Sequence, residues 1–502
     1  MPSRFEPPAP DAELAAFEAL KPRLRSLWSD VFPRDDEPYT SVIVPSVSLD
    51  PDEIARQPGA IHFEEALLFL LIRLRNPRAR VVYVTSVPIA PTVLEYYLQF
   101  LAGVPASHAR NRVTLLSVQD YSPRPLTEKI LERPRVVERI RAAIFDPARA
   151  YLTVFRSTPL ERRLAIALGI PLNAADPGTD VLYGKSTARI LAREAGIAVP
   201  LGRENVRGEA EIVDTVEFLR SERPGLRRVV LKRNSATWEK GHALMSLPAG
   251  RSSDDTRRAL RELAFSVPGE TPQSFLERFA REGGVVEEFI DSPDMTAASV
   301  QLRINPLGKV SLTSTHDELR GGPLGMATTG CLFPATDPHR LEIQRAALGI
   351  GTLLAARGLI SRVSIEFLVW QGGQKIALSE INLGFGGTTH PLLAVRLLAG
   401  GELDPETGLF HSPTGRPKYY RATDHLTSDQ YRGLLPEDVI DTSTLNRLSY
   451  SQRSEAGALF YMLGALSEHA WVGMVAIGSS REEAEVVYRQ AIEALDRESR
   501  GE

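Results

Sequence analysis

The chain of 502 residues is too long for one hydrophobic core, so we expect roughly two to four domains. A hydrophobic content of 43% and a charged content of 24% are typical of a folded globular protein. The formal net charge is −4 and the charges are interspersed, which argues against a nucleic-acid partner. Cys331 is the only cysteine, which excludes an intramolecular disulfide and a cysteine-based zinc site, and we expect it to be a buried or half-buried thiol.

The beginning of the sequence lacks the apolar segment of a secretory signal. The longest apolar run near it, 66–72, is too short to cross a bilayer and is followed by Arg73 and Arg75. We therefore predict a cytoplasmic protein without a membrane partner, and the sequence leaves the oligomeric state open.

The first 178 residues are predicted to be an extension, 1–37, with one helix over 11–32, and then an α/β domain, 38–178. Strands are predicted at 41–47, 80–87, 112–118 and 151–155. Helices are predicted at 62–75, 91–102 and 159–169, and two helical stretches within about 126–144. This alternation indicates a parallel sheet covered on both faces, as in Rossmann-like domains. No G-x-G-x-x-G follows a strand, so we expect a scaffold rather than a dinucleotide site.

From about residue 179 the pattern changes to α+β. We predict one domain over 179–412, made of two α+β subdomains that enclose a cleft, and a small α+β domain over 413–502. Strands are predicted at 227–232, 283–290, 298–304, 309–315, 363–370, 375–383 and 472–478, and helices at 184–196, 341–357, near 454–468 and from 481 onward. Ser480 and Glu483 have the spacing of a capping box for the last helix.

Two neighbouring strands carry oxygen ligands on one face each. Glu366 lies on the polar face of an alternating strand, and Glu380 and Asn382 are two residues apart on the next. Two carboxylates and an amide oxygen suit Mg²⁺, and the alternative is a hydrogen-bonded polar patch at a sheet edge.

The connection between these strands decides whether Glu366 and Glu380 share a face. A regular two-residue turn at Gly372 and Gly373 would place the carboxylates on opposite faces. A three-residue loop over 372–374, or a two-residue turn corrected by a β-bulge, would place Glu366 opposite Glu380. We predict one of these two corrected registers.

Further side chains point to a nucleotide. Lys232 ends an apolar strand and enters a polar loop, where it can reach phosphate oxygens. The segment VVEEFID, 285–291, offers backbone groups at Ile290 for an adenine edge and carboxylates for ribose, with Asp294 as a second ribose candidate. The alternative for each is an exposed charge on the surface.

The segment EINLGFGGTTHP, 380–391, resembles the E-I-N-x-x-x-G-G-T-T-H-P segment of the pheganomycin-type peptide ligases, which are members of the ATP-grasp superfamily. The order of the parts, from the helix-leading Lys185 to the acid-bearing strands, is similar to that superfamily as well. Segments in the α/β domain are similar to a pre-ATP-grasp domain, and 472–484 is similar to a small carboxyl-terminal domain. The likeness covers roughly residues 40–495.

This resemblance implies ATP and two Mg²⁺ ions as cofactors. The implied ATP contacts come from Lys185, Lys232, Glu287, Glu288, Ile290 and Asp294, and the implied metal ligands are Glu366, Glu380 and Asn382. A carboxylate would be activated as an acyl phosphate and captured by an amine, with release of ADP and phosphate.

Three positions depart from the family pattern, and the first is Glu366, which stands where an aspartate is common and whose longer side chain still reaches a metal. The loop after Lys232 contains only Gly241, whereas such lids are usually rich in glycine, and we expect Lys240 to replace part of its phosphate binding. Ser364 stands where some relatives have an arginine, and Arg303 is the predicted replacement unless it forms a cross-strand salt bridge. His390 is predicted either to act as general base for the amine or to fix its loop by hydrogen bonds.

We therefore predict an ATP-grasp carbon–nitrogen ligase of the peptide-forming kind, acting on a small-molecule carboxylate and amine, with an amino acid or a peptide on at least one side. Two alternatives remain. One is a nucleotide-binding regulatory protein that has lost turnover, and the other is an ATP-grasp enzyme with a non-amine acceptor.

Overall fold

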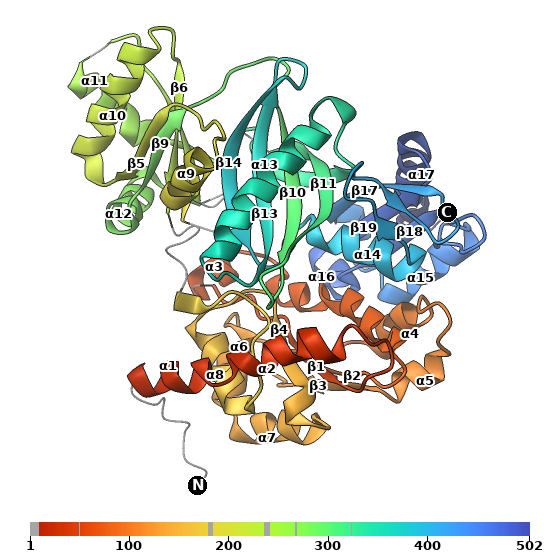
Figure 1. The fold of residues 1–502 in the computed structure, drawn as a ribbon. Helices are drawn as coiled ribbons and strands as arrows, with labels where there is room; N and C mark the ends of the chain where they lie inside the picture. The colour runs from red at the N-terminus through yellow and green to blue at the C-terminus, as the bar shows by residue number, and fades with distance from the viewer. Residues whose placement is uncertain are drawn as a thin grey trace.

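The structure is a computed structural model that describes residues 10–49, 51–178, 184–234, 241–250, 252–266, 269–322 and 324–501. In Figure 1 the amino-terminal elements, red to yellow, lie beneath a long green sheet, with a smaller yellow-green sheet on one side and the blue carboxyl-terminal elements on the other. Among the described residues, no helix has both the length and the apolar character that crossing a membrane requires.

The predicted first helix is divided. It consists of α1 (Pro10–Glu18), α2 (Lys21–Ser26) and a π-helical turn (Leu27–Val31). Pro22 in the first turn of α2 has no N–H to continue the hydrogen-bond ladder of α1, so a new helix starts there. The aromatic rings of Trp28 and Phe32 at the π-helical turn pack on Tyr151 of the following sheet.

The predicted parallel sheet is present in the strand order β3-β2-β1-β4. Its strands are β1 (Thr40–Val44), β2 (Arg80–Thr85), β3 (Val113–Ser117) and β4 (Ala150–Val154), with helices α3 (Pro51–Ala55), α4 (Pro91–Leu98), α5 (Ala106–Arg110), α6 (Leu126–Leu131), α7 (Pro134–Ala143) and α8 (Pro159–Leu168). The helix predicted over 62–75 is instead two 3₁₀ segments, Ala60–Glu65 and Leu68–Arg75. Every side chain from Ala66 to Leu71 is buried, so tertiary packing rather than helix propensity determines this segment.

A five-stranded antiparallel sheet follows in the order β5-β9-β6-β7-β8. Its elements are α9 (Lys185–Glu194), β5 (Gly202–Val206), α10 (Gly208–Glu222), β6 (Arg228–Arg233), β7 (His242–Ser246), α11 (Ser253–Ala259), β8 (Ala264–Phe265), α12 (Pro272–Glu282) and β9 (Gly284–Glu288). Phe275 and Phe279 of α12 are buried in the core of this unit with Val286 of β9.

The largest sheet has ten strands, and its main path is β14-β13-β10-β11-β12-β17-β16-β15. The strands of its first part are β10 (Thr296–Ile304), β11 (Val310–Gly321), β12 (Ala327–Phe333), β13 (Ser361–Trp370) and β14 (Lys375–Leu383). Helix α13 (Asp337–Ala356) precedes β13, and α14 (Thr389–Ala399) follows β14. Its second part contains β15 (Glu402–Leu403), β16 (Phe410–His411), β17 (Pro417–Thr427), α15 (Pro436–Leu445), β18 (Gly457–Tyr461), α16 (Leu466–His469), β19 (Trp471–Gly478) and α17 (Arg481–Arg500).

The carboxyl-terminal segment shares this sheet, because β12 pairs with β17 at Phe333 and Tyr420. The prediction of a helix near 454–468 is wrong: 457–461 forms β18, whose five residues are all buried beside β19. Aromatic and aliphatic residues on both sides favour a buried strand over an amphipathic helix. At the start of α17, Ser480 accepts a hydrogen bond from the Glu483 N–H, while the Glu483 carboxylate accepts one from the Ser479 N–H.

Candidate active site

A cavity of about 1030 Å³ lies where the two antiparallel sheets face each other above the parallel sheet. Six of the side chains for which ATP or metal contacts are predicted line this cavity together, and these are Lys185, Lys232, Glu287, Glu366, Glu380 and Asn382. The positions come from α9, β6, β9, β13 and β14, so the fold assembles the cavity from segments far apart in the sequence.

The two predicted carboxylates share a face. Glu366 lies opposite Glu380, and the register shifts directly afterwards because Phe367 pairs with Leu378, which leaves Ser379 as the bulged residue. Asn382 Nδ2 donates to Glu366 Oε1 at 2.9 Å and is 3.2 Å from Glu380 Oε1. The three side chains therefore form one group, as predicted.

The turn confirms the second of the two predicted registers. Trp370 pairs with Lys375, and the Gln374 N–H donates to the Gln371 carbonyl at 3.2 Å, which encloses Gly372 and Gly373 as the two central residues. Their φ angles are 63° and 89°, in the left-handed region that glycine adopts without strain. The β-bulge then shifts the register by one residue before Glu366 is reached.

The electrostatics of the two carboxylates differ. Burial raises the pKa of Glu366 well above its ordinary value, and the neighbouring charges of Glu318 and Glu380 raise it further. Burial also acts to raise the pKa of Glu380, but the charges of Lys185, His242 and Lys232 outweigh it and hold the pKa well below its usual range. A cation between the two carboxylates would allow both to be ionised, so this pair fits a divalent metal.

The protein supplies only part of a coordination shell. Within the described ranges, no group of three or more histidine, cysteine, aspartate or glutamate side chains is arranged to hold a metal ion. Two carboxylates and one amide are a set that Mg²⁺ accepts, because it takes its other ligands from water and substrate phosphates.

Both predicted lysines are buried in ion pairs. Lys185 is the first residue of α9 and pairs with Glu380. Lys232 Nζ lies 2.8 Å from Glu287 Oε1 and donates to the carbonyl of Ser379, the bulged residue, at 3.1 Å. Lys240 falls outside the described residues, as does most of the predicted lid.

The predicted ribose carboxylates have other partners. Glu287 is 3% exposed, and its two oxygens contact Lys232 and Arg189, so it neutralises these cations. Glu288 and Ile290 line the cavity, and Glu288 also accepts the Leu201 N–H at 2.9 Å.

Asp294 does not line the cavity. It lies on the surface and accepts the Gly372 N–H at 2.7 Å, so it stabilises the β13–β14 turn. Because its carboxylate is directed to this backbone group, its position does not support the predicted contact with ribose.

The prediction that Arg303 serves in this cavity is wrong. Arg303 lies on the predicted polar face of β10. However, it lies near the end of the strand, where it donates to Asn173 and lines a different cavity. The sequence shows the face of a strand residue through its period of two, but not which cavity that part of the strand lines.

Arg320 is the arginine that sequence reasoning missed. It lines the cavity from β11, with its Nη2 2.7 Å from Glu318 Oε2 and 3.5 Å from Glu366 Oε2. The alternation Glu318-Leu319-Arg320 is a signal of period two that would have extended the strand predicted at 309–315.

His390 lines the cavity near the start of α14 and is 1% exposed. Burial lowers its pKa to about 4, so the imidazole is neutral at neutral pH. Neither ring nitrogen has a hydrogen-bond partner among the described residues. The loop is instead held by threonines, since Gln301 donates to Thr388 Oγ1 at 2.6 Å, so the loop-fixing alternative for His390 has no hydrogen bond to support it.

Comparisons with known proteins agree with this architecture. A family model described as "IQCH-like, ATP-grasp" matches residues 266–404. The chain is 28% identical over 472 residues to the L-propargylglycine–L-glutamate ligase of Streptantibioticus cattleyicolor, which covers 92% of this chain and 95% of that protein. It is 24% identical over 453 residues to IQ motif-containing protein H of Danio rerio, covering 80% of this chain but only 42% of that relative.

Solved structures of similar fold cover nearly the whole chain. A biotin carboxylase from Campylobacter jejuni has a TM-score of 0.56 at 12% identity and covers 91% of each chain. An N5-carboxyaminoimidazole ribonucleotide synthetase in complex with ADP has a TM-score of 0.51 at 12% identity and covers 93% of this chain and 98% of its own. These likenesses show a shared multidomain fold.

Proposed function

We propose that this chain is an ATP-grasp protein and that it works as an ATP-dependent ligase that joins a carboxylate to an amine. The observation that carries the proposal is the meeting of Glu366, Glu380 and Asn382 with Lys185 and Lys232 in one cavity. We further propose that 38–178, 179–412 and 413–502 act as its pre-ATP-grasp, ATP-grasp and carboxyl-terminal domains, and that it works in the cytoplasm.

In the proposed mechanism, Lys185 and Lys232 bind the phosphates of ATP as point charges. Glu366, Glu380 and Asn382 would hold Mg²⁺, in our proposal two ions, which when bound neutralise charge on the triphosphate. The two lysines are already held in place by Glu380 and Glu287, so little rearrangement is needed to present them.

The chemistry proceeds in two balanced steps. An oxygen of the substrate carboxylate forms a bond to the γ-phosphorus of ATP, and the bond from that phosphorus to the β,γ-bridging oxygen breaks, which releases ADP. The amine nitrogen then attacks the acyl carbon, inorganic phosphate leaves, and the nitrogen loses a proton. We propose that the neutral ring of His390, which has both nitrogens unpartnered among the described residues, receives this proton.

The substrates are proposed to include an amino acid on at least one side of the new bond. The support is the likeness to a ligase that joins two amino acids, L-propargylglycine and L-glutamate, over nearly the full length of both chains.

The test is release of ADP by the purified full chain with MgATP, with and without a pool of amino acids. We expect ADP release that depends on amino acids. We also expect a product whose mass equals the sum of its two components less one water. The matched controls are the Lys232→Met variant and a surface variant, Lys309→Met. ADP release that is the same with and without amino acids, or that is as fast in Lys232→Met as in the wild-type chain at an ATP concentration below the wild-type KM, would contradict the proposal.

A further inference from the structure

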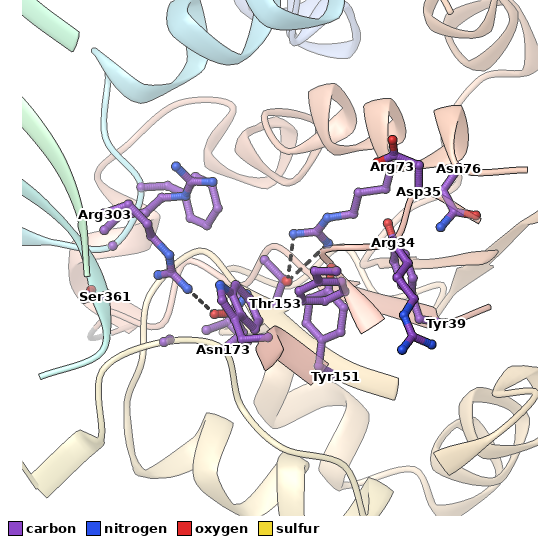
Figure 2. Close-up of a pocket in the computed structure, with 17 residues that line it drawn as sticks. Arg34, Asp35, Tyr39, Arg73, Asn76, Tyr151, Thr153, Asn173, Arg303 and Ser361 are labelled. Carbon is purple, nitrogen blue, oxygen red and sulfur yellow. Dashed lines mark hydrogen bonds between the residues drawn. The ribbon is translucent and has the colours of Figure 1, made fainter. Parts of the chain in front are cut away.

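A second cavity, of about 310 Å³, lies between the amino-terminal segment, the end of β4 and the ends of β10 and β13. Figure 2 shows Arg303 on one side and Arg73 on the other, with Thr153, Asn173 and Tyr151 between them. Arg362 lines it as well, and the cavity volume is at the lower end of the range for small-molecule sites.

The three inner arginines have no acidic partner. Within the described ranges, neither Arg73, Arg303 nor Arg362 forms an ion pair, although such pairs are frequent elsewhere in the chain. Arg73 bonds the hydroxyls of Ser41 and Thr153, and Arg303 bonds the amide oxygen of Asn173.

Arg362 has fewer polar contacts among the described residues than Arg73 and Arg303. Its guanidinium makes no side-chain hydrogen bond to any residue that the structure describes and lies 5.0 Å from the ring of Phe385. At the exposed rim, Arg34 is 3.1 Å from Glu37, and Asp35 is the one acid among the described lining residues. The lining therefore has a clear excess of positive charge.

The positive charges act on one another. Burial, and to a smaller extent the nearby charge of Arg73, lower the pKa of Arg303 to about 10. Burial lowers the pKa of Arg362 well below its ordinary value, and the charges of Arg303, Arg396 and Arg73 add to this. Like charges partly removed from water disfavour one another, and an anion between them would relieve the repulsion.

Aromatic rings orient two of the guanidinium groups. Arg303 lies 5.5 Å from the centre of Trp28, and Arg73 lies 5.1 Å from the centre of Tyr151. A guanidinium stacked on a ring keeps its N–H edge available, which is the geometry that binds carboxylate or phosphate oxygens in pairs.

The cavity adjoins the active site. On β13 the residues Arg362, Ser364 and Glu366 follow one another at spacings of two, and they pair with Arg303, Gln301 and Ser299 of β10. One polar face therefore runs from the arginines to the metal-site carboxylate, a distance of about 13 Å along the strand. Gly384 and Phe385 line both cavities.

We propose that this arginine-lined cavity binds the carboxylate or phosphate group of an anionic small molecule. The inference rests on the proposed ligase function, which it deepens: the continuous polar face points to a substrate whose anionic group lies remote from the reacting carbon. A separate anion that occupies the cavity on its own is the other source of the same chemistry.

The first experiment titrates inorganic phosphate, and separately succinate, into the full chain saturated with Mg²⁺ and a non-hydrolysable ATP analogue. The analogue keeps the probe out of the phosphate-binding part of the active site. We expect binding at one site, weakened at least tenfold in Arg303→Gln and in Arg362→Gln and unchanged in Arg139→Gln, an exposed arginine of α7. Failure of the wild-type chain to bind either probe, or equal binding by all variants, would overturn the proposal.

Thermal unfolding measurements show whether a variant has lost its fold or only the anion site. Without added anion, Arg362→Gln should unfold at the same temperature as the wild-type chain or higher, because it removes an unpaired charge. Added phosphate should raise the midpoint of the wild-type chain and leave that of the variant unmoved. The same rise in both would count against the site.

Steady-state kinetics distinguish the two sources. A KM for one amino-acid substrate raised at least tenfold in Arg362→Gln, with kcat retained, identifies a substrate group as the anion. An unchanged KM together with lost phosphate binding identifies a separate anion. If the chain binds phosphate in this cavity but never releases ADP, the ligase proposal fails while the anion site stands. ADP release without anion binding would overturn the anion site and leave the ligase proposal standing.

Discussion

Glu366 lies opposite Glu380 because Ser379 bulges out of β14 between them and the turn. The same bulge presents the Ser379 carbonyl to Lys232 of the other sheet at 3.1 Å. One inserted residue thus places two carboxylates on one face and also anchors a lysine beside them. The geometry of the turn is therefore coupled to the geometry of the active site.

The two glycines of this turn should differ in their tolerance of alanine. Both have positive φ, which costs an alanine about 1–2 kcal/mol. A Cβ at Gly372 meets nothing within 4 Å, but one at Gly373 would lie 2.7 Å from Cβ of Pro338. We expect Gly373→Ala to lower the free energy of unfolding more than Gly372→Ala in denaturant titrations. Equal losses would contradict the packing described at this turn.

The two carboxylates should also separate stability from activity. Glu366→Gln should leave the unfolding free energy of the metal-free chain nearly unchanged, because burial and neighbouring acids already favour its neutral form. Glu380→Gln should destabilise the chain by about 3–5 kcal/mol, because it leaves Lys185 buried without its partner. Both should abolish turnover with MgATP. Normal turnover in Glu366→Gln would rule out the metal site, and equal stability of the two variants would rule out the charge assignment.

Lys232 should contribute to ATP binding. Lys232→Met removes a buried positive charge from the cavity and leaves Glu287 paired with Arg189 alone, so we expect the KM for ATP to rise about tenfold or more. Lys309→Met removes a charge from an exposed turn and serves as the matched control. Calorimetry with MgADP gives the same comparison without turnover, and identical affinities would exclude Lys232 from the phosphate site.

Stability should fall in mild acid. The pKa of buried His390 is lowered from 6.5 to about 4, so between these pH values the unfolded chain binds more protons than the folded chain. The contribution is therefore fully present above pH 6.5 and is lost as the pH falls toward 4, by about 3 kcal/mol in all. Buried His316 adds a loss of the same sign.

The check is the slope of unfolding free energy against pH from 7 to 4. His390→Gln should flatten the slope relative to the wild-type chain, whereas His108→Gln, an exposed histidine, should not change it. A slope that is identical in all three chains would show that the ring of His390 reaches solvent when it is protonated.

The active-site carboxylates were predictable because strand alternation fixes faces and two adjacent glycines fix the turn. Arg303 shows where such reasoning ends: its face on β10 was predicted correctly, but its depth along a nine-residue strand decided which cavity it lines. Glu318 and Arg320 were missed because the polar segment HDELRG does not look like a strand, although it continues β11. The alternation of period two is present there, but the alternating residues are charged because they line a cavity. The buried strand β18 could not be distinguished from a helix in the sequence because short apolar segments fit both periods.

The ten-stranded sheet has a consequence for any attempt to shorten the chain. A protein ending after residue 412 would lose β17, and the backbone N–H and C=O groups of β12 at Cys331 and Phe333 would lose the partners they have at Ala422 and Tyr420. An uncovered strand edge beside buried aromatic rings is a template for pairing between molecules. We therefore expect such a truncation to aggregate rather than to yield a smaller working enzyme, so the carboxyl-terminal segment cannot be treated as a detachable module.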